Sequence, residues 1–242
     1  MSGPPPRLHA YVKVEIYSDV VCPWCYIGHT RFARAAERYR AKGGQVEVVL
    51  RPFQLAPDAE SRGEPLIDWL AAKFGGPERA GQMMTRVVSA GAEDGLELNF
   101  DRAVHANTFE AHRLIRLAAE QGRGEEMLER LFRAHFTDGL DIGSAEVLEK
   151  LAGELGVRTG SASGSGAGDG RDGAADVRED LAGARAIGVT SVPLFLFEGR
   201  FAVSGAQPED VLLAALEEVA ERTGQTPAAQ AGDGCDDDHC AV

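Results

Sequence analysis

The sequence lacks three features that would each place it in a distinct class of proteins. No window approaches the roughly 18 consecutive apolar residues of a membrane-spanning helix, so we expect no membrane span. The opening residues include three prolines but no basic segment followed by an apolar core, so we expect no secretory signal and a cytoplasmic protein. Positive charge is in deficit: 38 acidic residues face 25 basic ones, a net charge of −13. That balance repels phosphate backbones and anionic lipid, so we expect no nucleic acid and no membrane surface as partners.

Cysteine is scarce too, but its spacing is informative. The four cysteines form two pairs, Cys22 and Cys25 in a C-x-x-C motif and Cys235 and Cys240 in a C-x-x-x-x-C motif. In the reducing cytoplasm that we expect, structural disulfides are unusual, and paired cysteines are more often catalytic, redox-sensing or metal-bound. The cysteine pairs are therefore the first candidates for a functional site.

The segments around the first pair predict a β-α-β unit. Residues 11–21 alternate and then become apolar, which predicts a strand. Residues 22–42 carry an apolar stripe at helical spacing and are followed by two glycines, which predicts a helix. Residues 45–53 predict a second strand. The first cysteine pair lies at the turn from strand to helix.

The middle of the chain has a different character. Between residues 61 and 183 the sequence consists of amphipathic segments that end at or near glycine, which predicts an all-helical subdomain. A Gly/Ser/Asp-rich run at 159–176 matches no phosphate-binding motif, and we expect a flexible surface loop there.

After this subdomain the α/β character returns. A further helix is followed by residues 192–197 and 201–205, which predict a β-hairpin, and then by a last helix. We therefore expect an α/β core in two parts, residues 11–60 and 184–224, interrupted by the helical subdomain. Residues 225–242 have little apolar content and are expected to form a mobile acidic tail.

The position of the first cysteine pair predicts a reactive dithiol. With Cys22 at the helix N-cap, Pro23 occupies the first helical position, where its missing N–H costs nothing. Cys25 then lies one turn further on, within disulfide reach. The unpaired N–H groups and the positive end of the helix dipole stabilise a thiolate at this place. We expect Cys22, as the more exposed residue, to attack a substrate disulfide, and Cys25 to resolve the mixed disulfide.

Two other interpretations of this pair remain open. Cys235, His239 and Cys240 would provide further ligands for a zinc site, although that site would join the helix start to the distant end of the sequence. A purely structural disulfide is the other alternative. The C-x-x-C motif beside a β-α-β pattern favours redox chemistry over both, without metal.

Five stretches of the sequence also resemble a known family. VEIYSDVVCPWCYIG, RPFQLAPD, NTFEAHRL, GLDIGSAEVLEKLA and GVTSVPLFLFEGRFAVSGAQ are similar, in this order, to the DsbA-like thioredoxin-fold oxidoreductases of the FrnE subfamily. The resemblance spans about residues 12 to 222. It implies a thioredoxin fold with an inserted helical domain, an active Cys22–Cys25 dithiol, and no cofactor, because the dithiol carries the electrons. It also implies that Val192 and Pro193 form the loop opposite the dithiol, with Pro193 in the cis form, and help to hold an extended substrate peptide.

The sequence departs from the subfamily pattern at Ser191, where glycine is expected. The related 2-hydroxychromene-2-carboxylate isomerases and kappa-class glutathione transferases bind glutathione and use a serine near the position of Cys22. The presence of both cysteines argues against that activity here.

Trp24, between the two cysteines, affects both potential and substrate binding. It cannot stabilise a thiolate as a cationic histidine would, so we expect a reduction potential of about −180 to −270 mV rather than about −120 mV. Its exposed ring would also offer an apolar rim to unfolded client chains.

The second pair lies among three aspartates, which disfavour a thiolate at Cys235 and Cys240. Three hypotheses fit: a redox relay in which the tail exchanges disulfides with Cys22 and Cys25, an inert tail, or weak metal capture.

Other conspicuous residues have structural explanations. We expect His105, His112 and His135 to be packing, capping or surface residues rather than metal ligands. We expect Met83 and Met84 to fill the core.

These observations together predict a thiol–disulfide oxidoreductase, a reductase or isomerase, that acts on protein disulfides. Its expected partners are disulfide-containing or unfolded proteins, with glutathione or a thioredoxin-type protein as redox partner. The alternatives are a glutathione-dependent isomerase or transferase and a redox-switched holdase.

Overall fold

A computed structural model describes residues 11–159 and 173–223 of the chain. The second cysteine pair, the expected tail and most of the expected Gly/Ser loop lie outside these residues. Within them, no helix is long and apolar enough to cross a membrane.

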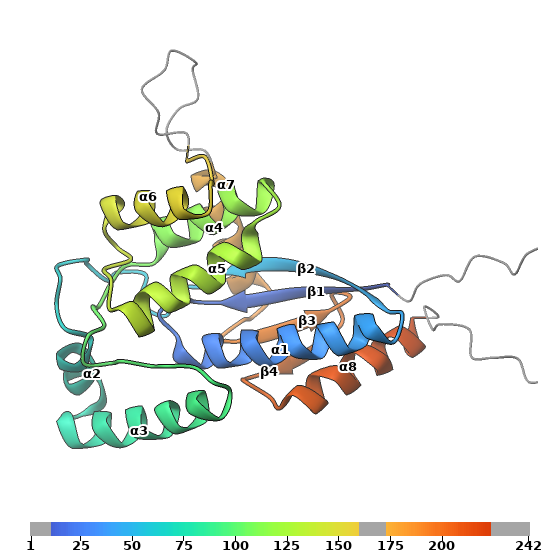
Figure 1. The fold of residues 1–242 in the computed structure, drawn as a ribbon, viewed down its shortest axis with the longest axis horizontal. Coiled ribbons are helices and arrows are strands. Elements are labelled where there is room, and N and C mark those ends of the chain that lie inside the picture. The colour runs from blue at the N-terminus through green and yellow to red at the C-terminus, as the bar shows by residue number, and fades with distance from the viewer. Residues whose placement is uncertain (1–10, 160–172, 224–242) are drawn as a thin grey trace, which may run out of the picture.

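The centre of the fold is a four-stranded sheet with strand order β2-β1-β3-β4 (Figure 1). The strands are β1 (Tyr11–Ser18), β2 (Gln45–Pro52), β3 (Leu194–Phe197) and β4 (Phe201–Ser204). β1 pairs in parallel with β2 and antiparallel with β3, and β3 and β4 form the predicted hairpin. This mixed sheet confirms the predicted thioredoxin fold, and it brings the two distant parts of the chain together through the β1–β3 pairing.

Two helices cover one face of the sheet, α1 (Pro23–Ala41) and α8 (Glu209–Arg222). They lie side by side in Figure 1. Side chains alternate between the faces of a strand, so the inward side chains of β1 meet Phe32 of α1 and Leu212 of α8 in one core. α1 therefore lies against the sheet along its length, and the end of β1 leads directly to its first turn.

The opposite face of the sheet is covered by α7 (Ala174–Ala186). Ala184 packs against Tyr17 of β1, and Asp180 forms an ion pair with Arg51 of β2 at 2.6 Å. The expected domain boundary at residue 183/184 therefore falls inside a helix that packs on the sheet as one unit. The expected loop at 159–176 likewise overlaps the first turn of α7.

The inserted part is helical, as predicted. Its elements are α2 (Leu66–Phe74), α3 (Pro77–Glu93), α4 (Phe109–Glu120), α5 (Gly124–Arg133), the π-helical turn η1 (Ala134–Asp138) and α6 (Ala145–Glu154). Their core includes the first turns of α1: the ring of Tyr26 stacks on Phe132 of α5 at a centroid distance of 5.0 Å. The beginning of α1 thus lies where the sheet and the inserted helices meet.

Candidate active site

Cys22 and Cys25 occupy the predicted positions at the start of α1. Cys22 is the N-cap residue, with the extended backbone angles φ −93° and ψ 112°, and Pro23 is the first helical residue. The Cys25 N–H donates to the Cys22 carbonyl at 3.0 Å, so the second cysteine lies one turn along the helix from the first. Both are free thiols. The structure therefore describes the site in its dithiol form.

The two thiols differ in their surroundings. Cys22 is only 6% exposed, less than expected for an attacking residue, and Cys25 is fully buried. Burial is the main cause that raises the pKa of Cys25 well above its usual value; the side chain of Cys22 and the charge of Asp19 act in the same direction. Cys25 therefore holds its proton at neutral pH, which suits a residue that reacts second.

The loop opposite the dithiol is the one that the resemblance implies. The Val192–Pro193 peptide bond is cis. The Cys22 thiol points to the Val192 carbonyl oxygen, with Sγ and O 3.9 Å apart. The loop approaches α1 closely because residue 28 is glycine: a Cβ there would lie 2.9 Å from Cγ of Pro193. Sequence reasoning missed Gly28, although a glycine inside a helix is a signal of close approach.

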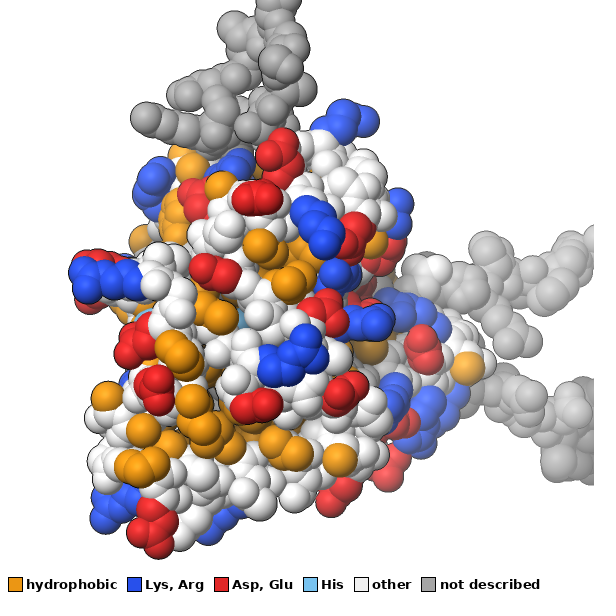
Figure 2. All heavy atoms as spheres, turned by 60° about the vertical axis from the view of Figure 1, so that its left-hand side comes forward, with side chains coloured by type: hydrophobic (Ala, Val, Ile, Leu, Met, Phe, Trp, Pro, Cys, Tyr) orange, Lys and Arg blue, Asp and Glu red, His pale blue; other side chains and the backbone are white. Residues whose placement is uncertain are grey.

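An apolar groove of about 240 Å³ opens beside Cys22. Its lining comes from the first turn of α1, the loop after β2 and helices α2 and α3, and includes Cys22, Trp24, Leu55, Trp69, Lys73, Met83 and His105. Trp24 is 40% exposed, consistent with the apolar rim that we predicted. Met83 is 44% exposed, so its assignment to the core was wrong: α3 turns it into the groove and toward solvent. Figure 2 shows hydrophobic side chains gathered on this face of the molecule, where α2 and α3 lie.

A buried acid lies behind the dithiol, and the sequence analysis did not single it out. Asp19, in the turn after β1, is fully buried, and its Oδ2 accepts the N–H of Leu55 at 2.8 Å. Its Oδ1 has no hydrogen bond but lies 3.4 Å from Nε2 of His112 on α4. That nitrogen is 3.0 Å from the Phe53 carbonyl oxygen, so it carries a hydrogen and donates to it. An acidic residue in the turn just before the cysteines was the available signal.

The other histidines pack in the interior, as expected. His105 stacks on Trp69 at 4.1 Å, and neither ring nitrogen of His135 has a hydrogen-bond partner. Burial lowers the pKa of His29 and of His135 to about 4, so both rings are neutral at pH 7. Among residues 11–159 and 173–223, no group of three or more His, Cys, Asp or Glu residues is arranged to hold a metal ion.

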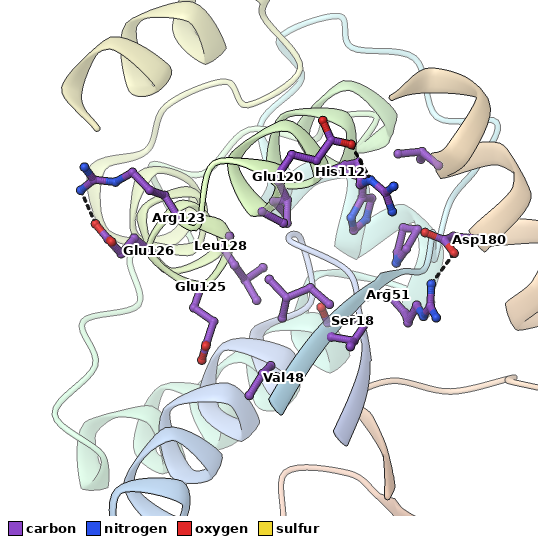
Figure 3. Close-up of a pocket in the computed structure, with 18 of the residues that line it drawn as sticks. Ser18, Val48, Arg51, His112, Glu120, Arg123, Glu125, Glu126, Leu128 and Asp180 are labelled. Atoms are coloured by element: carbon purple, nitrogen blue, oxygen red, sulfur yellow. Dashed lines mark hydrogen bonds and ion pairs between the residues drawn. The ribbon is translucent and has the colours of Figure 1, made fainter. Parts of the chain in front are cut away.

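A larger cavity, of about 610 Å³, lies away from the dithiol, between β2 and helices α4, α5 and α7. Figure 3 shows charged side chains around it that pair with one another: Arg123 with Glu126, and Arg51 with Asp180. His112 also lines this cavity. Except for Glu125, the charged side chains that line it are paired, and no cysteine among the described residues lines it, so this cavity is a poorer candidate site than the groove.

The fold and the cysteine pair together define a thioredoxin-fold thiol–disulfide oxidoreductase. Residues 13–217 match the model of the DSBA-like thioredoxin domain, and the chain belongs to this family. The family resemblance noted in the sequence is thereby confirmed. Among curated proteins, the uncharacterised protein YwbO of Bacillus subtilis is 32% identical over 147 residues, which cover 60% of this chain and 67% of that protein.

Solved structures agree with this assignment. A probable DsbA oxidoreductase from Streptomyces coelicolor is 33% identical and superimposes with a TM-score of 0.76, covering 96% of this chain and 99% of its own. A 2-hydroxychromene-2-carboxylate isomerase has a TM-score of 0.63 at 14% identity, covering 88% of this chain and 98% of its own. The cytosolic disulfide reductase DsbM of Pseudomonas aeruginosa, in its structure with GSH, has a TM-score of 0.54 at 19% identity, covering 88% and 97%. The last two share the fold.

Proposed function

We propose that this protein reduces or isomerises disulfides of protein substrates through Cys22 and Cys25. One observation carries the proposal: two free thiols in different environments lie at the start of a helix, the first beside an open groove and the second fully buried. A reaction in two steps needs one thiol that a substrate can reach and a second that stays unreactive until the mixed disulfide has formed.

The first step forms a mixed disulfide. The Cys22 thiolate attacks one sulfur of a substrate disulfide, a Cys22–substrate S–S bond forms, and the other substrate sulfur leaves as a thiolate that takes a proton from water. N–H groups of the first turn of α1 and the helix dipole stabilise the Cys22 thiolate before it attacks.

The second step closes the Cys22–Cys25 disulfide. Cys25 loses its proton and attacks Sγ of Cys22, and the remaining substrate sulfur leaves as a thiolate. The substrate gains two electrons and the dithiol loses two. An external thiol, glutathione or a thioredoxin-type protein, then returns the site to the dithiol form. Isomerisation results when the substrate thiolate instead attacks another disulfide of the substrate, and the thiolate freed there attacks the mixed disulfide and releases Cys22 as a thiolate.

The Val192–Pro193 loop and the groove would bind the substrate. The Val192 carbonyl accepts the thiol of Cys22 in the dithiol form, and an extended substrate segment beside the loop would compete for this backbone edge. Trp24 and the apolar lining would hold the side chains that flank the substrate cysteine.

The two alternative functions have less support. The likeness to an isomerase of 2-hydroxychromene-2-carboxylate concerns the fold, and this chain has a cysteine at both positions of its motif. A holdase would use the groove without needing the asymmetry between the two thiols. A cytoplasmic location remains part of the proposal, and the cytosolic location given for DsbM is in keeping with it.

The Cys235–Cys240 relay stays a hypothesis, because both residues lie outside the described part of the chain. A double Cys235→Ser, Cys240→Ser variant tests it. Under the relay, this variant is re-reduced more slowly by a protein reductant but reacts with substrate as fast as the unchanged protein.

Single-cysteine variants test the main proposal. Both variants also have Cys235 and Cys240 replaced by serine, so that only the site thiols can react. With a disulfide-linked peptide, we expect Cys25→Ser to accumulate a covalent enzyme–peptide adduct, because the resolving thiol is missing. The matched Cys22→Ser variant should form no adduct, because Cys25 is buried and protonated. Intact-mass analysis measures both. An adduct on Cys22→Ser, or full turnover by it, would exclude the proposed roles.

The reduction potential of the pair is a second test. Because Trp24 provides no positive charge to the thiolate, we expect a value of about −180 to −270 mV, measured by thiol trapping across a glutathione redox series. A value near −120 mV would contradict this account of Trp24 and point to an oxidase.

A further inference from the structure

The groove beside Cys22 contains one positive charge in an apolar surface. Lys73 and His105 are the two lining residues with basic side chains. Burial is the main cause that lowers the pKa of His105; the charge of Glu64 raises this pKa and that of Lys73 lowers it, with a net decrease, so His105 is neutral at pH 7. Lys73 is thus the charge that a bound segment would meet.

The ammonium group of Lys73 is held by aromatic rings and not by an acid. Its Nζ lies 4.3 Å from the centre of the Trp69 ring and 5.9 Å from that of Phe74. Within the described ranges it forms no ion pair, whereas Lys42 pairs with Glu217. Arg31, Arg34 and Arg38 of α1 likewise pair with Asp94, Glu209 and Asp210. The stack orients the ammonium at the groove while its capacity to bind an anion stays unused.

The negative charge of the rest of the protein confines the attraction of acidic groups to the neighbourhood of Lys73. With a net charge of −13, the surface as a whole repels acidic chains. An unpaired ammonium in the groove that Cys22 also lines reverses this repulsion at one place. Its effect is local, because charges separated by more than about 8 Å are screened at physiological ionic strength.

We propose that the groove selects client segments that combine apolar side chains with one acidic side chain near the reacting cysteine, and that Lys73 binds the acidic group. The inference rests on the proposed function and names the class of substrate that this site prefers. Apolar side chains of the client cover Trp24 and the methionines of α3, and the carboxylate replaces water at Nζ.

The lining fits such a segment better than it fits glutathione. Glutathione carries two carboxylates and an ammonium group with few apolar atoms. The groove offers one cation, no acidic side chain for an ammonium, and an otherwise apolar lining. A polypeptide whose single carboxylate meets Lys73 leaves no charge unpaired in the groove.

Peptide pairs test the proposal on the full chain. The assay uses the full chain with Cys235 and Cys240 replaced by serine, so that only the site thiols react. Each peptide contains one cysteine, linked as a mixed disulfide to uncharged thiopyridine, and apolar flanking residues. A glutamate is placed two to five residues from the cysteine, and the partner peptide has glutamine there. The reduced protein attacks the peptide sulfur and releases pyridinethione, whose absorbance gives the second-order rate constant.

We expect the glutamate peptide to react about threefold to fivefold faster at one or more of these positions, the range for a partly exposed ion pair. The preference should disappear in Lys73→Gln, remain in Lys73→Arg, and decline as salt is added. Lys42→Gln, which removes a lysine at the far end of α1, is the matched control and should keep it.

Equal rates for glutamate and glutamine at every position, or a preference that survives in Lys73→Gln, would overturn the inference. So would a dependence on Lys73 seen with glutathione disulfide and not with the peptides. Reaction with uncharged dithiodipyridine separates the two proposals, because it needs Cys22 but offers no carboxylate for Lys73 to bind. If a Cys22→Ser variant in which Cys235 and Cys240 are also serine keeps that reaction, the proposed function itself fails.

Discussion

Asp19 adds a negative charge to the closed side of the dithiol, where water does not reach. Its carboxylate has one strong donor, the N–H of Leu55, and a weaker contact with His112. Burial and the side chain of Cys22 are the larger causes that raise the pKa of Cys25; the charge of Asp19 adds a smaller increase, and the hydrogen bond to the Asp19 backbone acts against it. The carboxylate therefore makes a small contribution to keeping the resolving thiol protonated.

Replacing Asp19 by asparagine tests this effect, because the asparagine side chain has nearly the same shape as aspartate but carries no charge. We expect the pKa of Cys25 to fall, since one of the causes that raise it is removed. The measurement is the pH dependence of Cys25 alkylation in a background where Cys22, Cys235 and Cys240 are serine, with and without Asp19→Asn. An unchanged profile would mean that Asp19 acts through its hydrogen bonds alone.

At the scale of elements, the site depends on how closely the cis-proline loop packs on α1. Gly28 permits this contact, and the open space around Gly183 of α7 offers a comparison, since a Cβ there would meet nothing within 4 Å. Both glycines lie inside helices, where alanine stabilises the helix by about 1 kcal/mol relative to glycine. They differ in what the added methyl group would meet.

We therefore expect opposite results from the two alanine variants. Gly183→Ala should raise the free energy of unfolding by about 1 kcal/mol and leave disulfide exchange unchanged. Gly28→Ala should show no such gain and should slow exchange, because the methyl group displaces Pro193 from α1. Urea unfolding and the peptide assay measure both. If the two variants behave alike, the loop does not need its contact with α1.

For the whole molecule, local patterns predicted the elements and missed the contacts between distant ones. The alternation in β1 and the proline after Cys22 were sufficient to place the dithiol at a helix start. The contact between Asp19 and His112 joins a turn to a helix far along the chain, and the spacing of apolar residues in the sequence does not indicate such a contact. The near burial of Cys22 depends in the same way on Val192, 170 positions away.

The buried histidines make a prediction about the stability of the entire fold. In the unfolded chain a histidine takes up a proton near pH 6.5, whereas the folded protein keeps His29 and His135 neutral down to about pH 4. The contribution of these two histidines to the free energy of unfolding is therefore fully present above pH 6.5. It declines as the pH falls toward 4, by up to about 3 kcal/mol for each ring.

Urea unfolding at several pH values between 7 and 4 measures this decline. His135→Leu changes packing at every pH, but it should also reduce the slope of stability against pH, which a packing change alone would not do. An unchanged slope would show that His135 already takes up its proton in the folded protein.

The stacking of Tyr26 on Phe132 has a consequence for attempts to simplify the protein. The residue that follows Cys25 belongs to a core built mainly by the inserted helices. Excision of those helices, to leave a minimal thioredoxin, would uncover the first turns of α1 at the point where the thiols react. The redox centre is therefore not a detachable module. Substitutions in α5, which contains neither cysteine, are therefore a route for changing the reduction potential of the Cys22–Cys25 pair without altering the motif itself.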